Sequence, residues 1–343
     1  DTTEYSPSSR GYAHAQRYEA IEDCEVVACA DVVAEHAQRF VDAFELPADR
    51  AFTDHQKMLE AVQPDIVGVT TPPTVREDIV LDAAQTDGVQ AIHTEKPLGH
   101  TPAGCRRMVE GCADADVQLS VHHQQRMSES ARHIRELVDD GEIGEVRRIE
   151  GSREDLAEAG IHQVDLCNYF NGDRDVKWVL GGLDYSRERI KKGVHNETQT
   201  IAVWEYDDGV HAIWESMPKD SGANKLTGGA IDINNRVVGT DGTIERPNAD
   251  EFRIRRWGDG EWESFDYSGN DNDQRAITEA VESLAEGREP TISGRRVLPA
   301  AMLVYGIRES ARQRARIEFP LELDEDPLAA MVESGEITPG TGE

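Results

Sequence analysis

The sequence predicts an α/β protein of two domains: a doubly wound parallel sheet, then an α+β domain with an open, mainly antiparallel sheet. In the first third of the chain, short apolar runs alternate strictly with helical patterns, as in parallel βαβ units. After about residue 145 the apolar runs become longer and amphipathic, and Asp-Gly turns join them, which is typical of antiparallel strands. At 343 residues the chain can form two domains, which we expect over 1–123 and 124–343.

The first domain is expected to contain five strands with helices between them. The strands are predicted over 25–31, 50–52, 65–73, 89–97 and 117–123. The helices are predicted over 32–44, 53–62 and 76–88, with one more beginning after residue 100. Thr53 is placed to cap the second helix and Gly88 to end the third, and Thr101 and Pro102 have the N-cap and first-turn residue types for the last.

The second domain is expected to be built from long strands and three helices. The strand segments are 145–154, 175–186, 197–217 and 230–245, and the helices are at about 160–170, 274–286 and 296–314. Asp208-Gly209 and Asp241-Gly242 are predicted hairpin turns. The last twenty residues are acidic and rich in turn formers, so we expect them to pack loosely.

The charge balance excludes several classes of partner. Acidic residues number 67 against 36 basic ones, for a formal net charge of -31, and only seven residues are lysine. Such a surface repels phosphate backbones and anionic membranes, which argues against a nucleic-acid or membrane partner. A large acid excess with few lysines is typical of proteins from a salt-rich, halophilic cytoplasm, where salt screens the self-repulsion.

The cysteines and the hydropathy point to the same compartment. The five cysteines are scattered and form no C-x-x-C pair, so neither a disulfide framework nor a zinc knuckle is indicated. No apolar run approaches the roughly 20 residues needed to span a bilayer. We therefore expect reduced thiols and a cytoplasmic location.

Seven stretches follow one another along the chain: RGYAHAQRYEAI, EVVACAD, DIVGVTTPP, HTEKPLGHT, VHHQQRM, GIHQVDLCNYF and AVESLAEGREPTISG. Together they resemble the Gfo/Idh/MocA family of nicotinamide-dependent oxidoreductases. The family places a first strand and a glycine-rich turn before all of these. Here YSPSSRG stands where that turn is expected, and only Gly11 matches its last glycine. We expect a missing segment before Asp1, or an extended loop there.

The resemblance implies a set of cofactor-binding residues. Asp31 ends a predicted strand, where its carboxylate would accept hydrogen bonds from an adenosine ribose and repel a 2'-phosphate, so NAD is favoured over NADP. The alternative for Asp31 is a helix N-cap, and for the T-T-P-P stretch an ordinary strand stop. The residues that the resemblance assigns to the cofactor are Ser9, Arg10, Gly11, Asp31, Thr70, Thr71, Pro72, Glu95, Lys96 and Gln124.

The implied catalytic residues lie in two of these stretches. Lys96 follows a strand that ends at the ligand crevice, and Pro97 restrains the backbone behind it; an ammonium there would stabilise a developing alkoxide. His162 would accept the hydroxyl proton, with Asp165 on the same helix face and Glu158 four residues earlier setting the imidazole tautomer. The alternatives are a solvated turn for Lys96 and a helix-surface pair for His162 and Asp165.

The stretch VHHQQRM raises the question of a metal site. Neighbouring strand residues point to opposite faces, so His122 and His123 are not expected to bind one ion, and no metal is predicted. We expect Gln124 and Arg126 to line the crevice instead, with Arg126 and His162 contacting the substrate.

The predicted function is an NAD-dependent dehydrogenase acting on a hydroxyl of a sugar, cyclitol or related polyol. Two alternatives remain open: a family member that cleaves glycosidic bonds by transient oxidation and returns NAD unchanged, and a non-catalytic cofactor-binding protein. A homodimer or homotetramer formed through the antiparallel sheet is also expected.

Overall fold

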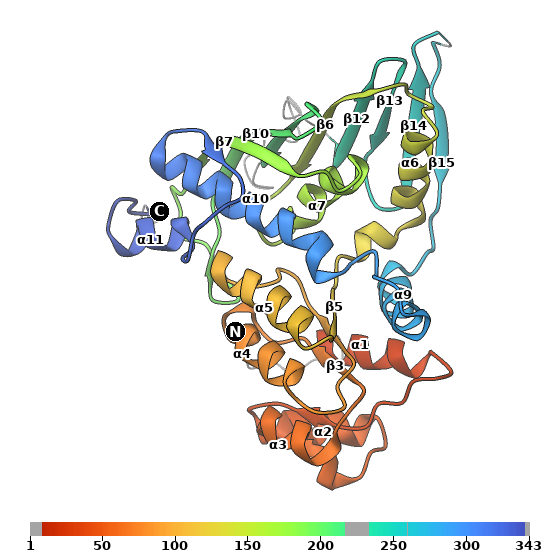
Figure 1. Cartoon of the computed structure of the whole chain (residues 1–343), viewed down its shortest axis with the longest axis vertical. Helices are drawn as coiled ribbons and strands as arrows, with labels where there is room; N and C mark the ends of the chain where they lie inside the picture. Colours follow the sequence, from red (N-terminus) through yellow and green to blue (C-terminus); the bar gives the residue numbers. More distant parts are fainter. Residues whose placement is uncertain (1–8, 217–232, 259, 340–343) are drawn as a thin grey trace.

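The computed structural model describes residues 9–216, 233–258 and 260–339, which form two lobes (Figure 1). The lobe drawn in red and orange carries the short parallel strands, and the other carries a large sheet. The parts of the predictions that concern residues 5–8, 217, 230–232 and 340–343 lie outside these residues. No helix in the described ranges is both long and apolar enough to cross a membrane.

The parallel strands of the first lobe form two small sheets. β1 (Cys29–Ala30) pairs with β2 (Ala51–Phe52), while β3 (Ile66–Val69), β4 (Ala91–Thr94) and β5 (Gln118–Val121) pair in sequence order. Their helices are α1 (Arg10–Glu19), α2 (Ala34–Ala43), α3 (His55–Val62), α4 (Pro73–Ala84) and α5 (Pro102–Asp114). The predicted alternation of parallel strands and helices is confirmed. The strands are shorter than predicted, because only these residues have ladder partners.

Two predicted helix ends in this lobe are wrong and one is confirmed. The N-cap of α3 is Asp54 rather than Thr53, because the Asp54 carboxylate accepts hydrogen bonds from the backbone of the first turn. α4 ends at Gln85, and Gly88 lies three residues later in the turn before β4. Thr101 caps α5 as predicted, accepting from Gly104 N at 3.0 Å.

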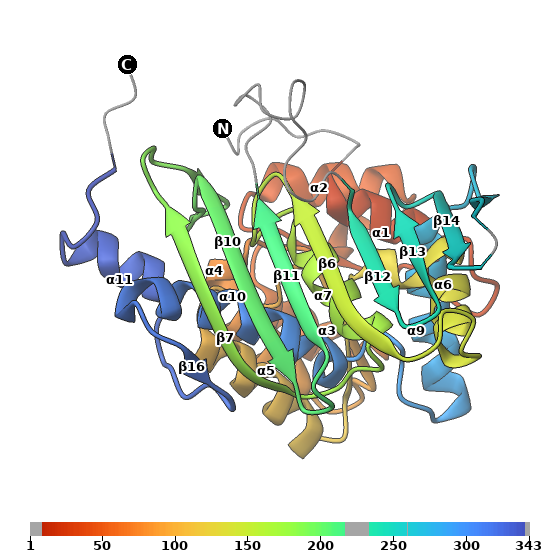
Figure 2. The ribbon, with the colours of Figure 1, turned by 90° about the horizontal axis from the view of Figure 1, so that it is seen from above.

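The second lobe is a nine-stranded sheet with helices on one face (Figure 2). Its order is β15-β14-β13-β12-β6-β11-β10-β7-β16, and only the β6–β11 pair is parallel. The strands are β6 (Val146–Arg153), β7 (Val176–Asp184), β10 (Gln199–Tyr206), β11 (His211–Ser216), β12 (Asn235–Gly239), β13 (Gly242–Arg246), β14 (Glu251–Arg256), β15 (Glu263–Asp266) and β16 (Ile317–Glu318). The predicted, mainly antiparallel sheet is confirmed.

The first lobe also contains the short helix η1 (Ala48–Arg50). The remaining elements of the second lobe are η2 (Gln124–Met127), α6 (Glu129–Asp139), α7 (Ile161–Phe170), the β8–β9 ribbon (Ile190–Lys191 and Val194–His195), α9 (Asn272–Glu286), α10 (Gly294–Gln313) and α11 (Pro327–Glu333). The prediction that the C-terminal tail packs loosely is wrong for the described part of the tail. Asp326 caps α11, and Leu328 and Met331 are buried against Tyr185, so apolar burial anchors the segment.

The helices of the second lobe also hold the first one. α10 packs against α5, α7 and β7, and α9 packs against α1 (Figure 1). One continuous apolar core includes residues of both lobes. Lys96, beyond β4, contacts Glu158, and His123, beyond β5, packs against His162, so residues around 96, 123 and 162 lie together. A domain boundary at residue 123, directly before η2, stays a prediction.

Candidate active site

Lys96 lies directly beyond the end of β4 and is tethered by one residue of the second lobe. Its Nζ donates to the Glu158 backbone oxygen at 2.6 Å and to Glu158 Oε1 at 3.3 Å. The Lys96 side chain is 15% exposed, and the Lys96–Pro97 peptide is cis. Because an ammonium has three protons, one is left to donate to a ligand.

The charge of Lys96 is partly destabilised by its surroundings. Burial lowers its pKa, the nearby Glu158 carboxylate raises it, and Lys192 lowers it again, with a net shift below the ordinary value. Lys192 Nζ contacts the same Glu158 Oε1 at 3.2 Å. Glu158 is therefore the partner of two lysines, and not of the histidine that it was expected to orient.

His162 is buried on the first turn of α7. Burial lowers its pKa well below the ordinary value, and the neighbouring His123 and the charge of Lys96 lower it further. The His162 ring packs edge-on against that of His123, with centroids 5.3 Å apart. Lys96 Nζ donates to Glu158, four residues before His162, so the two side chains come from neighbouring segments. His162 Nδ1 is buried and has no hydrogen-bond partner among the described residues, and the lowered pKa favours the neutral imidazole.

Asp165 lies one turn after His162 and is paired with other groups. Arg126 Nε and Nη2 each donate to it at 2.7 Å, and His123 Nδ1 is 3.1 Å from its Oδ2. The Arg126 charge, with help from His123, lowers the pKa of Asp165 against the opposing effect of burial. The expected hydrogen bond from Asp165 to His162 is absent from the described contacts. His123, which the sequence analysis left without a role, lies between the two residues.

Arg126 does not line the crevice in the way that the sequence suggested. Its side chain is completely buried and also contacts Asp173 at 2.9 Å, so its donors serve the protein itself. A bidentate guanidinium of this kind holds a carboxylate in one orientation. We therefore assign Arg126 as a positioning residue for Asp165, in place of the expected substrate contact.

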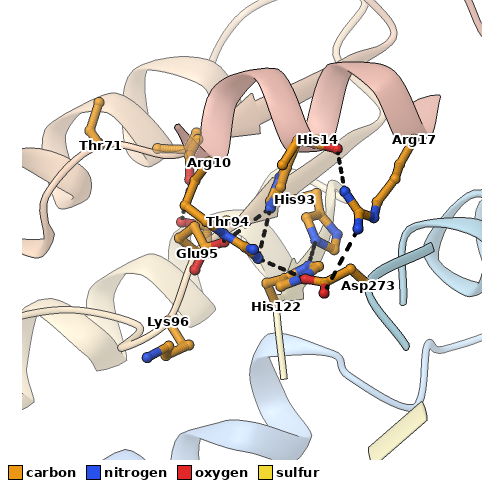
Figure 3. Close-up of polar contacts among 12 residues, drawn as sticks. Arg10, His14, Arg17, Thr71, His93, Thr94, Glu95, Lys96, His122 and Asp273 are labelled. Atoms are coloured by element: carbon orange, nitrogen blue, oxygen red, sulfur yellow. Dashed lines mark hydrogen bonds and ion pairs between the residues drawn. The ribbon is translucent and has the colours of Figure 1, made fainter. Parts of the chain in front are cut away.

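Glu95, next to Lys96, points to the opposite side of the strand end (Figure 3). Its carboxylate accepts from Arg10 Nε and lies 3.0 Å from His14 Nε2. Burial alone would raise the Glu95 pKa, but His14, His122 and Arg10 together lower it. Arg10, the first residue of α1, also donates to Asp273 Oδ1 at 3.0 Å. Glu95 thus holds the start of α1 rather than Lys96, and no signal in the sequence identified Asp273.

The remaining cofactor candidates lie at strand and helix ends of the first lobe. Asp31 follows β1, and its Oδ1 accepts from Val33 N at 2.8 Å. Ser9 is the N-cap of α1 but makes no side-chain capping bond. An added Cβ on Gly11 would lie 3.4 Å from Thr70 Oγ1, so α1 starts in contact with the end of β3. Pro72 is the N-cap of α4.

Two buried polar atoms near these strand ends are unpaired among the described residues. Thr71 Oγ1, beyond β3, and Gln124 Oε1, beyond β5, have no hydrogen-bond partner in the described part of the chain. Buried polar atoms are normally paired, so unpaired ones at the carboxyl ends of parallel strands indicate a ligand.

Lys96 lies beyond the end of a parallel strand, where open α/β sheets bind ligands, and a helix of the second lobe brings a buried imidazole to the same region. Residues 8–123 match the model of the Gfo/Idh/MocA oxidoreductase family, described as an NAD-binding Rossmann fold. The first lobe of the chain is therefore similar to the NAD-binding domain of this family, and NAD is the cofactor that the match indicates. The recognised resemblance is thereby confirmed.

Relatives match over nearly the whole chain. The D-apiose dehydrogenase of Paraburkholderia graminis is 26% identical, over 96% of this chain and 92% of its own. The myo-inositol 2-dehydrogenase of Thermotoga maritima is 21% identical, over 90% and 95%. Among solved structures, a levoglucosan dehydrogenase complexed with NADH and levoglucosan has a TM-score of 0.77 at 18% identity, covering 91% and 97%. At that identity the structural match supports the fold.

The residues present fit a bound NAD. Thr71 and Gln124 offer unpaired buried oxygens, Asp31 keeps a carboxylate beyond β1, and the α1 N-terminus begins at Ser9 and Arg10. A helix N-terminus and backbone N–H groups favour a pyrophosphate, and a carboxylate suits ribose hydroxyls.

Proposed function

We propose that the protein is an NAD-dependent dehydrogenase that oxidises a hydroxyl group of a sugar, cyclitol or related polyol. The observation that carries this proposal is the contact between Lys96 Nζ, beyond β4, and Glu158, which lies four residues before the buried His162. A neutral imidazole and an ammonium are the two groups that loss of a hydroxyl proton requires. The sugar and inositol dehydrogenases among the relatives support the substrate class.

In the proposed reaction, a bound NAD would be held by residues that include Asp31, Thr71 and Gln124 and would supply the hydride acceptor. His162 takes the hydroxyl proton on an unprotonated ring nitrogen, because its lowered pKa keeps the ring neutral before the reaction. Lys96 donates a hydrogen bond through its third N–H to the substrate oxygen and stabilises the negative charge that develops there. Glu158 holds the Lys96 amine in place through its backbone oxygen. Arg126 and Asp165 fix His123 against the His162 ring.

Absorbance at 340 nm tests the reaction directly. Purified protein with NAD and a panel of pentoses, hexoses, inositols and anhydrosugars should give net NADH formation with at least one compound. Product analysis should show a carbonyl in place of one hydroxyl. Cleavage of a glycoside with no change at 340 nm would contradict the proposal and support the transient-oxidation alternative. No described residue favours that alternative over the dehydrogenase.

The choice of NAD over NADP is proposed to depend on Asp31. Its carboxylate would repel a 2'-phosphate. Calorimetric titration should give tighter binding of NAD than of NADP, and Asp31→Ser should reduce the difference. Equal affinity of the wild-type protein for both dinucleotides would contradict this assignment.

We also propose a reducing cytoplasm as the compartment. All five cysteines are free, and burial raises the pKa of each thiol, so they are suited to remain reduced and unreactive. A homodimer or homotetramer is part of the same proposal, and its interface is considered in the Discussion.

A further inference from the structure

Three buried histidines from separate segments meet on the side of the β4 end opposite to Lys96 (Figure 3). His14 comes from α1, His93 from β4, and His122 follows β5; together they form the histidine cluster. Each offers one ring nitrogen, and the three nitrogens lie within 4.8 Å of one another. His93 Nε2 and His122 Nδ1 are 2.9 Å apart. The rings therefore converge on one small volume.

A carboxylate fixes the orientation of one of these rings. His122 Nε2 lies 2.7 Å from Oδ1 of Asp273 on α9. Because an ionised carboxylate can only accept, His122 carries its proton on Nε2 and directs the lone pair of Nδ1 into the cluster. Metal-binding histidines are commonly held in this way, by a carboxylate on the far nitrogen.

Hydrogen bonds within the protein do not satisfy the cluster. Nδ1 of His14 and Nδ1 of His93 are buried and unpaired among the described residues. The sites of these nitrogens are nearly closed to solvent, since His14 and His93 are 3% and 1% exposed. His93 Nε2 and His122 Nδ1 already contact each other, so the unpaired electron pairs are those of the two Nδ1 atoms. A metal ion could accept an electron pair from such a nitrogen.

Charged side chains surround the cluster. Glu95 Oε1 is 3.0 Å from His14 Nε2, and the Asp273 carboxylate contacts His122. Arg10 binds both carboxylates, and its Nη2 lies 3.5 Å from His14 Nε2. Arg17 Nη2 lies 3.9 Å from Asp273 Oδ2, so two carboxylates and two guanidinium groups surround the three imidazoles.

We propose that His14, His93 and His122 bind one Zn²⁺ ion at a structural site separate from the active site. Three imidazoles suit zinc, and Glu95 is within reach of a fourth, tetrahedral position. Lys96 points away from the cluster, so the ion has no part in proton transfer (Figure 3). It would join α1 to β4 and β5, and through Asp273 to α9. The sequence analysis predicted no metal because it considered only the neighbouring pair His122 and His123, which do point to different sides.

Cobalt and zinc titrations of the full chain test the proposal. After treatment with EDTA and removal of the chelator, the protein should bind one Co²⁺ with visible d–d absorption. Equimolar Zn²⁺ should abolish that absorption and raise the melting temperature. An unsaturable titration, or a Co²⁺ spectrum typical of the aqueous ion, would overturn the proposal without the need for any variant.

Variants locate the site. Asp273→Asn keeps all three ligands and should weaken Zn²⁺ binding about 10–100-fold, and His93→Gln should weaken it at least as much as that. His133→Gln, outside the cluster, and Lys96→Met should leave affinity unchanged. The Lys96 variant separates this site from the proposed dehydrogenase chemistry. Unchanged binding in folded His93→Gln would overturn the assignment; if that variant does not fold, unchanged affinity in Asp273→Asn would do so.

Discussion

Lys96 and Lys192 contact the same carboxylate, but they differ in position. Lys96 is 15% exposed at the strand end, and Lys192 is 47% exposed. We predict that Lys96→Met lowers kcat by about 10²–10³, because it removes the positive charge that stabilises the alkoxide. NAD affinity should change little. The measurement is steady-state kinetics together with calorimetric titration of NAD.

Lys192→Met is the matched control for that prediction. It makes the same substitution and removes a contact to the same Glu158 oxygen. We expect its kcat to stay close to that of the wild type. An equal loss of kcat in both variants would mean that the charge of Glu158, rather than the Lys96 amine, is what matters.

The pH dependence of kcat/KM should report both perturbed groups. His162 must be neutral to accept a proton, and its lowered pKa moves the loss of activity to well below pH 6.5 on the acid side. Lys96 must be protonated, and its lowered pKa moves the loss of activity to below pH 10.5 on the basic side. Profiles should be recorded only where circular dichroism shows a folded protein. An acid limb at or above pH 6.5 would contradict the role given to His162.

The places of single candidate residues in the fold were predictable, but their partners were not. Lys96 and His162 follow from a strand end and a helix stretch that can be recognised in the sequence. Glu158 binds Lys96 across 62 positions, and Asp165 binds Arg126 across 39. Which carboxylate meets which base is decided by how α7 packs on the ends of β4 and β5. Asp273 and the histidine cluster depend on the docking of α9 and α1 in the same way.

At the scale of elements, the start of α7 is the most constrained segment of the site. Asp155 Oδ1 accepts from the backbone N of Glu158 at 3.0 Å and of Ala159 at 2.7 Å, forming a tight turn before the helix. A Cβ on Gly160 would lie 1.9 Å from the Asp155 backbone oxygen and 2.7 Å from Trp214. The backbone must therefore shift to accept any side chain there.

We predict that Gly160→Ala destabilises the protein by about 1–3 kcal/mol and lowers kcat, because His162 lies two residues further on. Urea denaturation and steady-state kinetics measure the two effects. Gly258→Ala, after β14, is the control, since a Cβ there meets nothing within 4 Å and its φ is not positive. A Gly160→Ala variant as stable and active as the Gly258 variant would show that the turn can relax freely.

Elements were more predictable than their ends. Apolar periodicity identified every strand of the parallel sheets, since burial of one or both faces of a strand produces that periodicity. The ends depend on competition between neighbours, as at Thr53 and Asp54, where the backbone conformation decides which side chain reaches the first turn. The anchored α11 was missed because a short apolar run within an acidic stretch is too weak a signal without Tyr185 beside it.

At the scale of the whole molecule, the net charge of -31 should make stability depend on salt. The Debye length falls from about 10 Å at 0.1 M to about 3 Å at 1 M, which screens repulsion between carboxylates. We predict that the free energy of unfolding rises with KCl over this range at pH 7. The rise should largely disappear near the sequence pI of about 4.7, where net charge vanishes. An equal rise at both pH values would show that the effect is not charge screening.

The outer face of the large sheet is the surface we propose for self-association. Helices cover only the other face (Figure 2), and Ile201 on β10 and Leu180 on β7 are 63% and 45% exposed on the outer one. Val203 pairs directly with Leu180 and lies two residues after Ile201 on β10. Apolar side chains grouped on an uncovered sheet face are typical of a subunit interface.

We predict that the wild-type protein is a dimer or tetramer by light scattering and that Ile201→Glu shifts it towards monomer. A glutamate at this position would meet its own symmetry copy, or an apolar surface, in an isologous interface, and burial of that charge opposes association. Val75→Glu is the control, since Val75 is 49% exposed on α4, away from the sheet, and should leave the assembly unchanged. If Ile201→Glu keeps the wild-type mass at all concentrations, the interface lies elsewhere. Because α7 packs against β6 on the inner face of the same sheet, loss of the dimer should leave the Lys96–His162 site assembled and only modestly change kcat.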